Sequence, residues 1–197
     1  MQDRRAPDGL AGVSDETAPP ARRAFWVDPE VDPRNGDDPV GEVATLRHYL
    51  DHYRMTFEMK CEGLTPEQLA ARSVPPSTMS LLGLVRHLAK IEHHWFRRTL
   101  GGRSDLAVLY ESDEEPDLDF DGAAGTTDCV AEAWESWNRE VAHAREVQAR
   151  YAALSEPFVP GAPYEARGVV VHMIEEYARH VGHADLLREC IDGRTGQ

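Results

Sequence analysis

Apolar residues recur at spacings of three and four along most of the chain, which is the period of amphipathic helices. The first such segment runs from about 40 to 62 and ends near Gly63. Its apolar stripe is formed by Val43, Leu46, Leu50, Tyr53, Phe57 and Cys61. Thr65-Pro66-Glu67-Gln68 then has the form of a capping box with proline at the first helical position, so we expect a short helix there.

Three further long helices are predicted. Ser80 is placed to cap the second, whose stripe is Leu81, Leu84, Leu88, Ile91 and Trp95 and which ends at Gly101-Gly102. The third runs from about 127 to 153 with the stripe Val130, Trp134, Trp137, Val141, Ala144, Val147, Tyr151 and Leu154. The fourth follows a break at 157–163 and runs to about Ile191, before Gly193. Without any strand pattern, this series predicts an all-α four-helix bundle.

Two segments lack the helical period. Residues 1 to about 38 are rich in Pro, Asp, Gly and Arg, which predicts an extended or disordered arm before a bundle domain of residues 39–197. Phe25-Trp26 is the place where this arm is expected to dock. Residues 103–126 are predicted to form a long solvated loop, because they carry the acidic run Glu111, Asp113, Glu114, Glu115, Asp117, Asp119 and Asp121.

Composition narrows the class of protein further. A formal charge of −14 argues against nucleic-acid and anionic-membrane partners, which both attract positive surfaces. No apolar run is long enough for a membrane span or a signal peptide, so we expect a cytoplasmic protein. The cysteines Cys61, Cys129 and Cys190 form no C-x-x-C pair and are predicted to be buried or half-buried.

The histidines are the informative feature, because six of the nine lie on the second and fourth predicted helices. On the fourth helix, one narrow strip bordering the apolar stripe contains His172, Glu176, His180 and His183. On the second helix, His87 and His94 border the stripe, whereas His93 points away from it. Two helices that bury their stripes in one core bring such borders together.

His87, Glu176 and His180 are the predicted metal ligands. Residues four apart on a helix lie one turn apart on one face, so Glu176 and His180 can reach the same ion. Two imidazoles and a carboxylate suit Zn, Ni, Fe or Mn better than Mg or Ca, and three ligands leave positions open for water or substrate. His183, His94 and His172 are candidates for a further ligand or for a partner that orients one.

Other interpretations stay open at this point. A Glu-x-x-x-His pair on a helix is also a common surface pair, and a non-catalytic metal-binding bundle has the same pattern. His48 and His52 are also four apart, but they lie opposite the first stripe and are predicted to face solvent. The chain has no G-x-S-x-G elbow and no glycine-rich phosphate loop.

Two segments resemble the DinB/YfiT-like superfamily. Leu84-Val85-Arg86-His87-Leu88-Ala89, followed by Glu92-His93-His94-Trp95, resembles its second helix, and His180-Val181-Gly182-His183 resembles the H-x-G-(Q/H) signature of its last helix. The likeness spans about 40 to 193 and extends to an actinobacterial subfamily labelled mini-circle protein-like. Many members have histidine at the position of Glu176. The glutamate of this chain instead gives a His/Glu/His set, which is similar to the arrangement in mycothiol-dependent maleylpyruvate isomerases.

The resemblance implies a bundle, commonly a homodimer, with a metal triad at the positions of His87, Glu176 and His180. It also implies a metal-dependent S-transferase or isomerase that uses a small thiol such as mycothiol together with an electrophile. The alternative is a metal-binding or stress-associated bundle without catalytic activity. A plain interaction module without metal is the third interpretation.

Overall fold

The computed structural model describes residues 25–36, 38–151, 153–155 and 165–196. The four long helices are α1 (Glu42–Cys61), α3 (Leu81–Glu92), α5 (Thr127–Ala149) and α6 (Ala166–Asp192). Two short helices, α2 (Pro66–Leu69) and α4 (Leu118–Asp121), and the π-helical segment η1 (His93–Leu100) complete the order. The regular elements of the described residues are all helices, so the predicted all-α bundle is confirmed.

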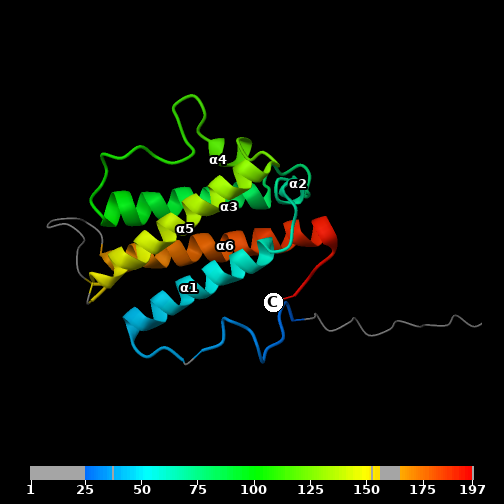
Figure 1. Cartoon of the computed structure of the whole chain (residues 1–197). Helices are drawn as coiled ribbons and strands as arrows, with labels where there is room; N and C mark the ends of the chain where they lie inside the picture. The colour runs from blue at the N-terminus through cyan, green and yellow to red at the C-terminus, as the bar shows by residue number, and fades with distance from the viewer. Residues whose placement is uncertain (1–24, 37, 152, 156–164, 197) are drawn as a thin grey trace, which may run out of the picture.

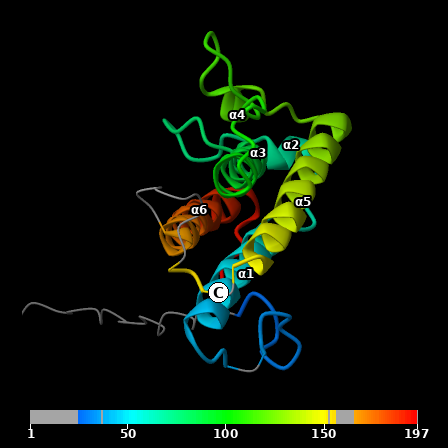
Figure 2. The ribbon, with the colours of Figure 1, turned by 90° about the vertical axis from the view of Figure 1, so that its left-hand side faces the viewer.

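The packing of the long helices sets α3 beside α6. The strongest contacts join α1 to α6 and α3 to α5, and α3 also packs on α6 (Figure 1). Figure 2 shows α3 and α6 end on as neighbours, with α5 crossing beside them. The short helix α4 lies against α3. The helices that carry the predicted metal ligands are therefore in direct contact.

Local sequence signals fix several helix ends. Thr65 and Gln68 form the predicted capping box at α2, and the Ser80 hydroxyl accepts a hydrogen bond from the Gly83 amide at the start of α3. Gly193 ends α6 in a left-handed conformation with φ of 76°. α5 ends at Ala149 rather than near 153, and the Arg47 guanidinium donates to the carbonyls of Gln148 and Tyr151 at this end.

The second predicted helix is regular only as far as Glu92. Beyond it, η1 has wider π-helical turns, and the Gly101 amide donates to the Phe96 carbonyl, five residues back, at 2.8 Å. His93 lies at this change of pitch and is buried against α5, where its Nδ1 is 3.3 Å from Glu140 Oε2. His93 therefore contacts α5 rather than the candidate ligands on α6.

The core contains one buried polar network among its apolar side chains. Arg54 of α1 donates to both carboxylate oxygens of Glu92 of α3 at 2.8 Å. Tyr177 of α6 also donates to Glu92 at 2.8 Å, and Trp137 of α5 donates to the Tyr177 hydroxyl at 2.8 Å. Each long helix contributes one residue, so the network fixes the four helices relative to one another.

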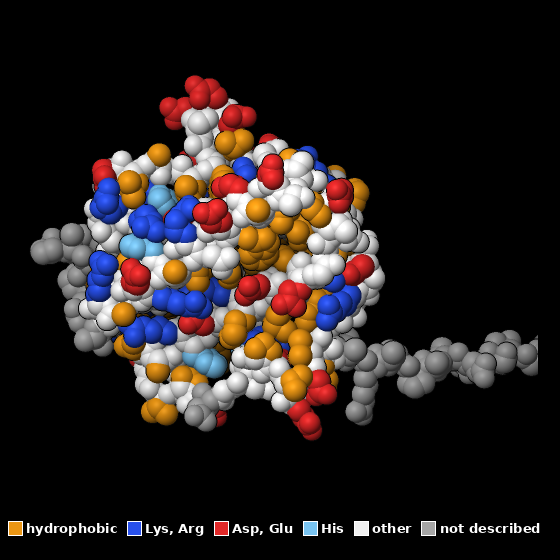
Figure 3. All heavy atoms as spheres, viewed as in Figure 1, with side chains coloured by type: hydrophobic (Ala, Val, Ile, Leu, Met, Phe, Trp, Pro, Cys, Tyr) orange, Lys and Arg blue, Asp and Glu red, His pale blue; other side chains and the backbone are white. Residues whose placement is uncertain are grey.

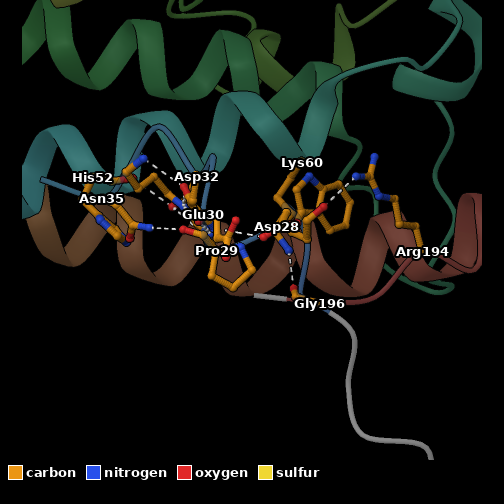
Figure 4. Close-up of polar contacts among 12 residues, drawn as sticks. Asp28, Pro29, Glu30, Asp32, Asn35, His52, Lys60, Arg194 and Gly196 are labelled. Atoms are coloured by element: carbon orange, nitrogen blue, oxygen red, sulfur yellow. Dashed lines mark hydrogen bonds and ion pairs between the residues drawn. The ribbon is translucent and has the colours of Figure 1, made fainter.

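The segment before α1 docks through Trp26, as the sequence predicts, while Phe25 is 71% exposed. The buried Trp26 ring has Lys60 Nζ 4.0 Å and Arg194 Cζ 3.8 Å from its centroid. Lys60 also donates to the Gly196 carbonyl at 2.7 Å (Figure 4). Residues 1–24 of the predicted arm, which spans 1–38, lie outside the described residues, and the domain boundary near 38 stays a prediction.

Trp26→Ala is expected to lower the free energy of unfolding by roughly 2 kcal/mol, because it removes one buried aromatic side chain and its contacts with cations. Phe25→Ala is the matched control and should leave stability unchanged. Urea unfolding followed by circular dichroism measures both variants. Equal stabilities of the two variants would contradict the docking role of Trp26.

The loop between η1 and α4 is acidic and projects from the bundle. Its acidic side chains are visible at the tip of the projection in Figure 3, and residues 111–117 are exposed. The predicted solvated loop is therefore confirmed for these residues. Cys61 is buried and Cys129 is partly buried, but the prediction for Cys190 is wrong, because this residue lies on the outer face of α6 and is exposed.

No helix among the described residues has the length and apolar character needed to cross a membrane.

Candidate metal centre

The structure brings His87, Glu176 and His180 together between α3 and α6. One ligand atom from each residue lies within 4.8 Å of the other two. Glu176 Oε2 is 3.8 Å from His87 Nε2 and 3.4 Å from His180 Nε2, and the two imidazole centroids are 4.7 Å apart. The three side chains predicted as ligands therefore converge on one point.

A buried carboxylate orients His87. Asp119 Oδ2 lies 2.9 Å from His87 Nδ1. Burial alone would raise the pKa of Asp119, but the hydrogen bond from His87 and the charge of Lys90 outweigh it and lower the pKa. The ionised carboxylate can only accept, so His87 carries its proton on Nδ1, and the lone pair of Nε2 faces Glu176 and His180.

His87 Nε2 itself has no hydrogen-bond partner within the described part of the chain, although it is buried. A buried polar atom without a partner is costly, and such an atom calls for a specific explanation. A metal ion bound by His87, Glu176 and His180 would satisfy it. The residues present therefore fit a divalent metal.

His180 is held in the neutral form that metal binding requires. Burial, with His87, His183 and Arg179 nearby, lowers the pKa of His180 to about 3. Its Nδ1 lies 3.3 Å from His183 Nδ1. When His180 donates a hydrogen bond from Nδ1 to His183 Nδ1, the lone pair of His180 Nε2 is free on the side of Glu176.

The three residues open into a pocket of about 720 Å³. Its wall is formed by Thr78, Met79, His87, Asp117, Phe120, Asp121, Glu176, Arg179, His180 and His183. This volume is within the range of pockets that bind small molecules. The three candidate ligands are therefore accessible to a substrate rather than enclosed on all sides.

The remaining candidates lie at different distances from the three ligands. His183 contacts His180, and His172 Nε2 is 3.5 Å from Glu176 Oε1. His94 instead lines a separate pocket, and its Nδ1 is 3.4 Å from an Arg98 nitrogen. His48 and His52 lie on α1, outside the cluster.

Asp119 is the site residue that sequence reasoning missed. The acidic run predicts a solvated side chain at this position, but Asp119 is only 2% exposed. The reason is the short helix α4, which packs on α3 and turns Asp119 inward. The signal available in the sequence is that two large apolar residues, Leu118 and Phe120, flank Asp119 within the acidic run.

The helical bundle, with its histidine and carboxylate cluster between α3 and α6, is consistent with the DinB/YfiT-like class of protein. The family model described as Mycothiol-S-transferase matches residues 45–193, and the chain belongs to this family. Comparisons with curated proteins and with solved structures gave no match.

Proposed function

We propose that this protein is a metal-dependent S-transferase that joins a mycothiol-type thiol to a small electrophile. The observation that carries the proposal is the unpartnered, buried Nε2 of His87, which Asp119 aims at Glu176 and His180. Membership in the mycothiol-S-transferase family supports a thiol as the cosubstrate. The pocket beside these residues supports access for small molecules.

His87, Glu176 and His180 would hold one divalent ion, for which Zn, Ni, Fe and Mn suit the donor set. A divalent ion held by these three residues would leave a coordination position for the thiol and would favour its thiolate form. The overall reaction forms a carbon–sulfur bond at the electrophile. The leaving group departs with its bonding electron pair, and the thiol proton passes to solvent.

The residues around the ligands have supporting roles in this proposal. Asp119 and His183 hold the rings of His87 and His180 in the orientation that frees both Nε2 atoms. Arg179 adds a cationic side chain to the pocket wall, and Phe120 stacks on His87 with centroids 5.2 Å apart. Phe120 thereby shields one face of the imidazole from water.

Metal analysis of the purified protein tests the ligand set. Wild-type protein expressed with ample metal is expected to contain about one equivalent of a divalent metal, and Glu176→Ala is expected to lose most of it, because two imidazoles alone bind weakly. Glu175→Ala is the matched control, since Glu175 is the next residue of α6 but its side chain is 72% exposed. Wild-type protein without stoichiometric metal would contradict the proposal.

A further inference from the structure

We infer that Arg86 is a positioning residue that holds residues 118–119 against α3, so that Asp119 fixes the ring of His87 for metal binding. This inference rests on the proposed function. It goes beyond the proposed function by giving the short helix α4 a part in building the site. Two adjacent residues of α3 bind Asp119 of α4. Arg86 binds its backbone carbonyl, and His87 binds its side-chain carboxylate.

The first contact is between Arg86 and the backbone of α4. Arg86 donates from Nε to the Asp119 carbonyl at 3.0 Å and from its terminal nitrogen to the Leu118 carbonyl at 3.0 Å. The Arg86 side chain is buried, and its guanidinium lies 4.1 Å from the centroid of the Tyr110 ring. Two charge-assisted bonds from a rigid, planar group fix both the position and the direction of this backbone segment.

The second contact is between His87 and the side chain of Asp119. Asp119 receives the hydrogen bond from His87 through Oδ2, while its Oδ1 accepts from the Phe120 amide at 3.2 Å. Lys90, one turn further along α3, lies 3.5 Å from the same Oδ2. The carboxylate therefore has little freedom once its backbone is held, and it determines which nitrogen of His87 carries the proton.

Two glycines allow this close approach of α4 to α3. A Cβ atom on Gly122 would lie 2.8 Å from a terminal nitrogen of Arg86 and 2.7 Å from the Leu118 carbonyl oxygen. A Cβ atom on Gly83 would lie 2.8 Å from the Phe120 ring. Both contacts are too short for any larger residue without displacement, so the backbone is adapted to this contact on both helices.

Zinc affinity, measured by competition with a chromophoric chelator, is the first test. Arg86→Met and Asp119→Asn are each expected to bind zinc about 10- to 100-fold more weakly than wild type, the range found when a partner that orients a metal ligand is lost. Arg72→Gln is the matched control, because Arg72 also binds α4, through Asp121 at 3.0 Å, but from the exposed side. Wild-type affinity in both Arg86→Met and Asp119→Asn would overturn the inference.

The tautomer of His87 is the second test, and it needs no metal. Nitrogen-15 NMR of the metal-free protein is expected to show the proton on Nδ1 in wild type and a mixture of tautomers in Arg86→Met. An unchanged tautomer in a folded Arg86→Met variant would overturn the inference. If wild type binds no zinc, the proposed function fails, while the tautomer comparison still decides the role of Arg86.

Gly122→Ala tests the contact between Arg86 and α4 from the α4 side, and it changes no charged group. It is expected to lower zinc affinity about 10-fold, because the added methyl group displaces Arg86 from the Leu118 carbonyl. Gly168→Ala is the control, since a Cβ there meets no atom within 4 Å. If Arg86→Met does not fold, Gly122→Ala and Asp119→Asn decide the question, and wild-type zinc binding by both would overturn the inference.

Discussion

Arg54→Ala is expected to lower the free energy of unfolding by about 3 to 5 kcal/mol, the usual cost of removing one partner of a buried ion pair. Arg54 is 1% exposed and Glu92 is fully buried, so the variant leaves the Glu92 carboxylate in the core without its cationic partner. Burial raises the pKa of Glu92, and removing Arg54 takes away the charge that opposes this rise. The loss also loosens the network that joins the four long helices.

Urea unfolding followed by circular dichroism measures this change. Arg167→Ala is the control, because Arg167 forms an ion pair with Glu42 in which both side chains are well exposed, and little change is expected. The double variant Arg54→Met with Glu92→Met should be more stable than Arg54→Ala, because neither charge is left buried alone. A stable, fully folded Arg54→Ala protein would show that the network does not hold the helices together.

Most of the fold can be predicted from the sequence, because helix formation depends on local signals. The spacing of apolar residues locates α1, α3, α5 and α6, and the side chains of Thr65 and Ser80 mark two helix starts. α5 ends before its apolar period does, and Arg47, a residue far away in the sequence, donates to carbonyls at that end. A constant period of 3.6 residues also fails to predict the π-helical turns of η1.

The candidate site also contains residues that the sequence predicts and one that depends on tertiary contacts. His87, Glu176 and His180 follow from helical phase, because two helices that bury their apolar stripes bring the borders of those stripes together. Asp119 does not follow from phase, because its position depends on how α4 docks on α3. That docking depends on Arg86 and on the space left by Gly122, which are tertiary contacts.

His94 marks the limit of helical phase as a guide. The sequence places it on the same border as His87, seven residues further along the second helix. In the structure it lies at the start of η1, about 10 Å further along the helix axis than His87 at 1.5 Å per residue, and it contacts Arg98 instead of the three candidate ligands. Helical phase therefore predicts the face on which a histidine lies, but not whether its side chain reaches a given point along that face.

His180→Ala is expected to lower the rate of thiol transfer by about 100- to 1,000-fold. A metal ion contributes several kcal/mol to such a reaction, and each 1.36 kcal/mol corresponds to a factor of ten in rate. His180 is buried, and its side chain is one of the three whose ligand atoms converge within 4.8 Å. The measurement is the initial rate at which free mycothiol is consumed with an activated aryl halide, in buffer containing zinc.

His48→Ala is the control for this prediction, because His48 lies on α1 outside the cluster, and its rate should equal that of wild type. Circular dichroism of each variant separates lost activity from lost fold. Treating wild type with a chelator then distinguishes the two functional interpretations. A catalytic ion leaves the helical signal intact while activity falls and returns with metal, whereas a structural ion unfolds the bundle when removed. A wild-type rate in His180→Ala would show that the three converging residues are not the catalytic centre, whatever metal they bind.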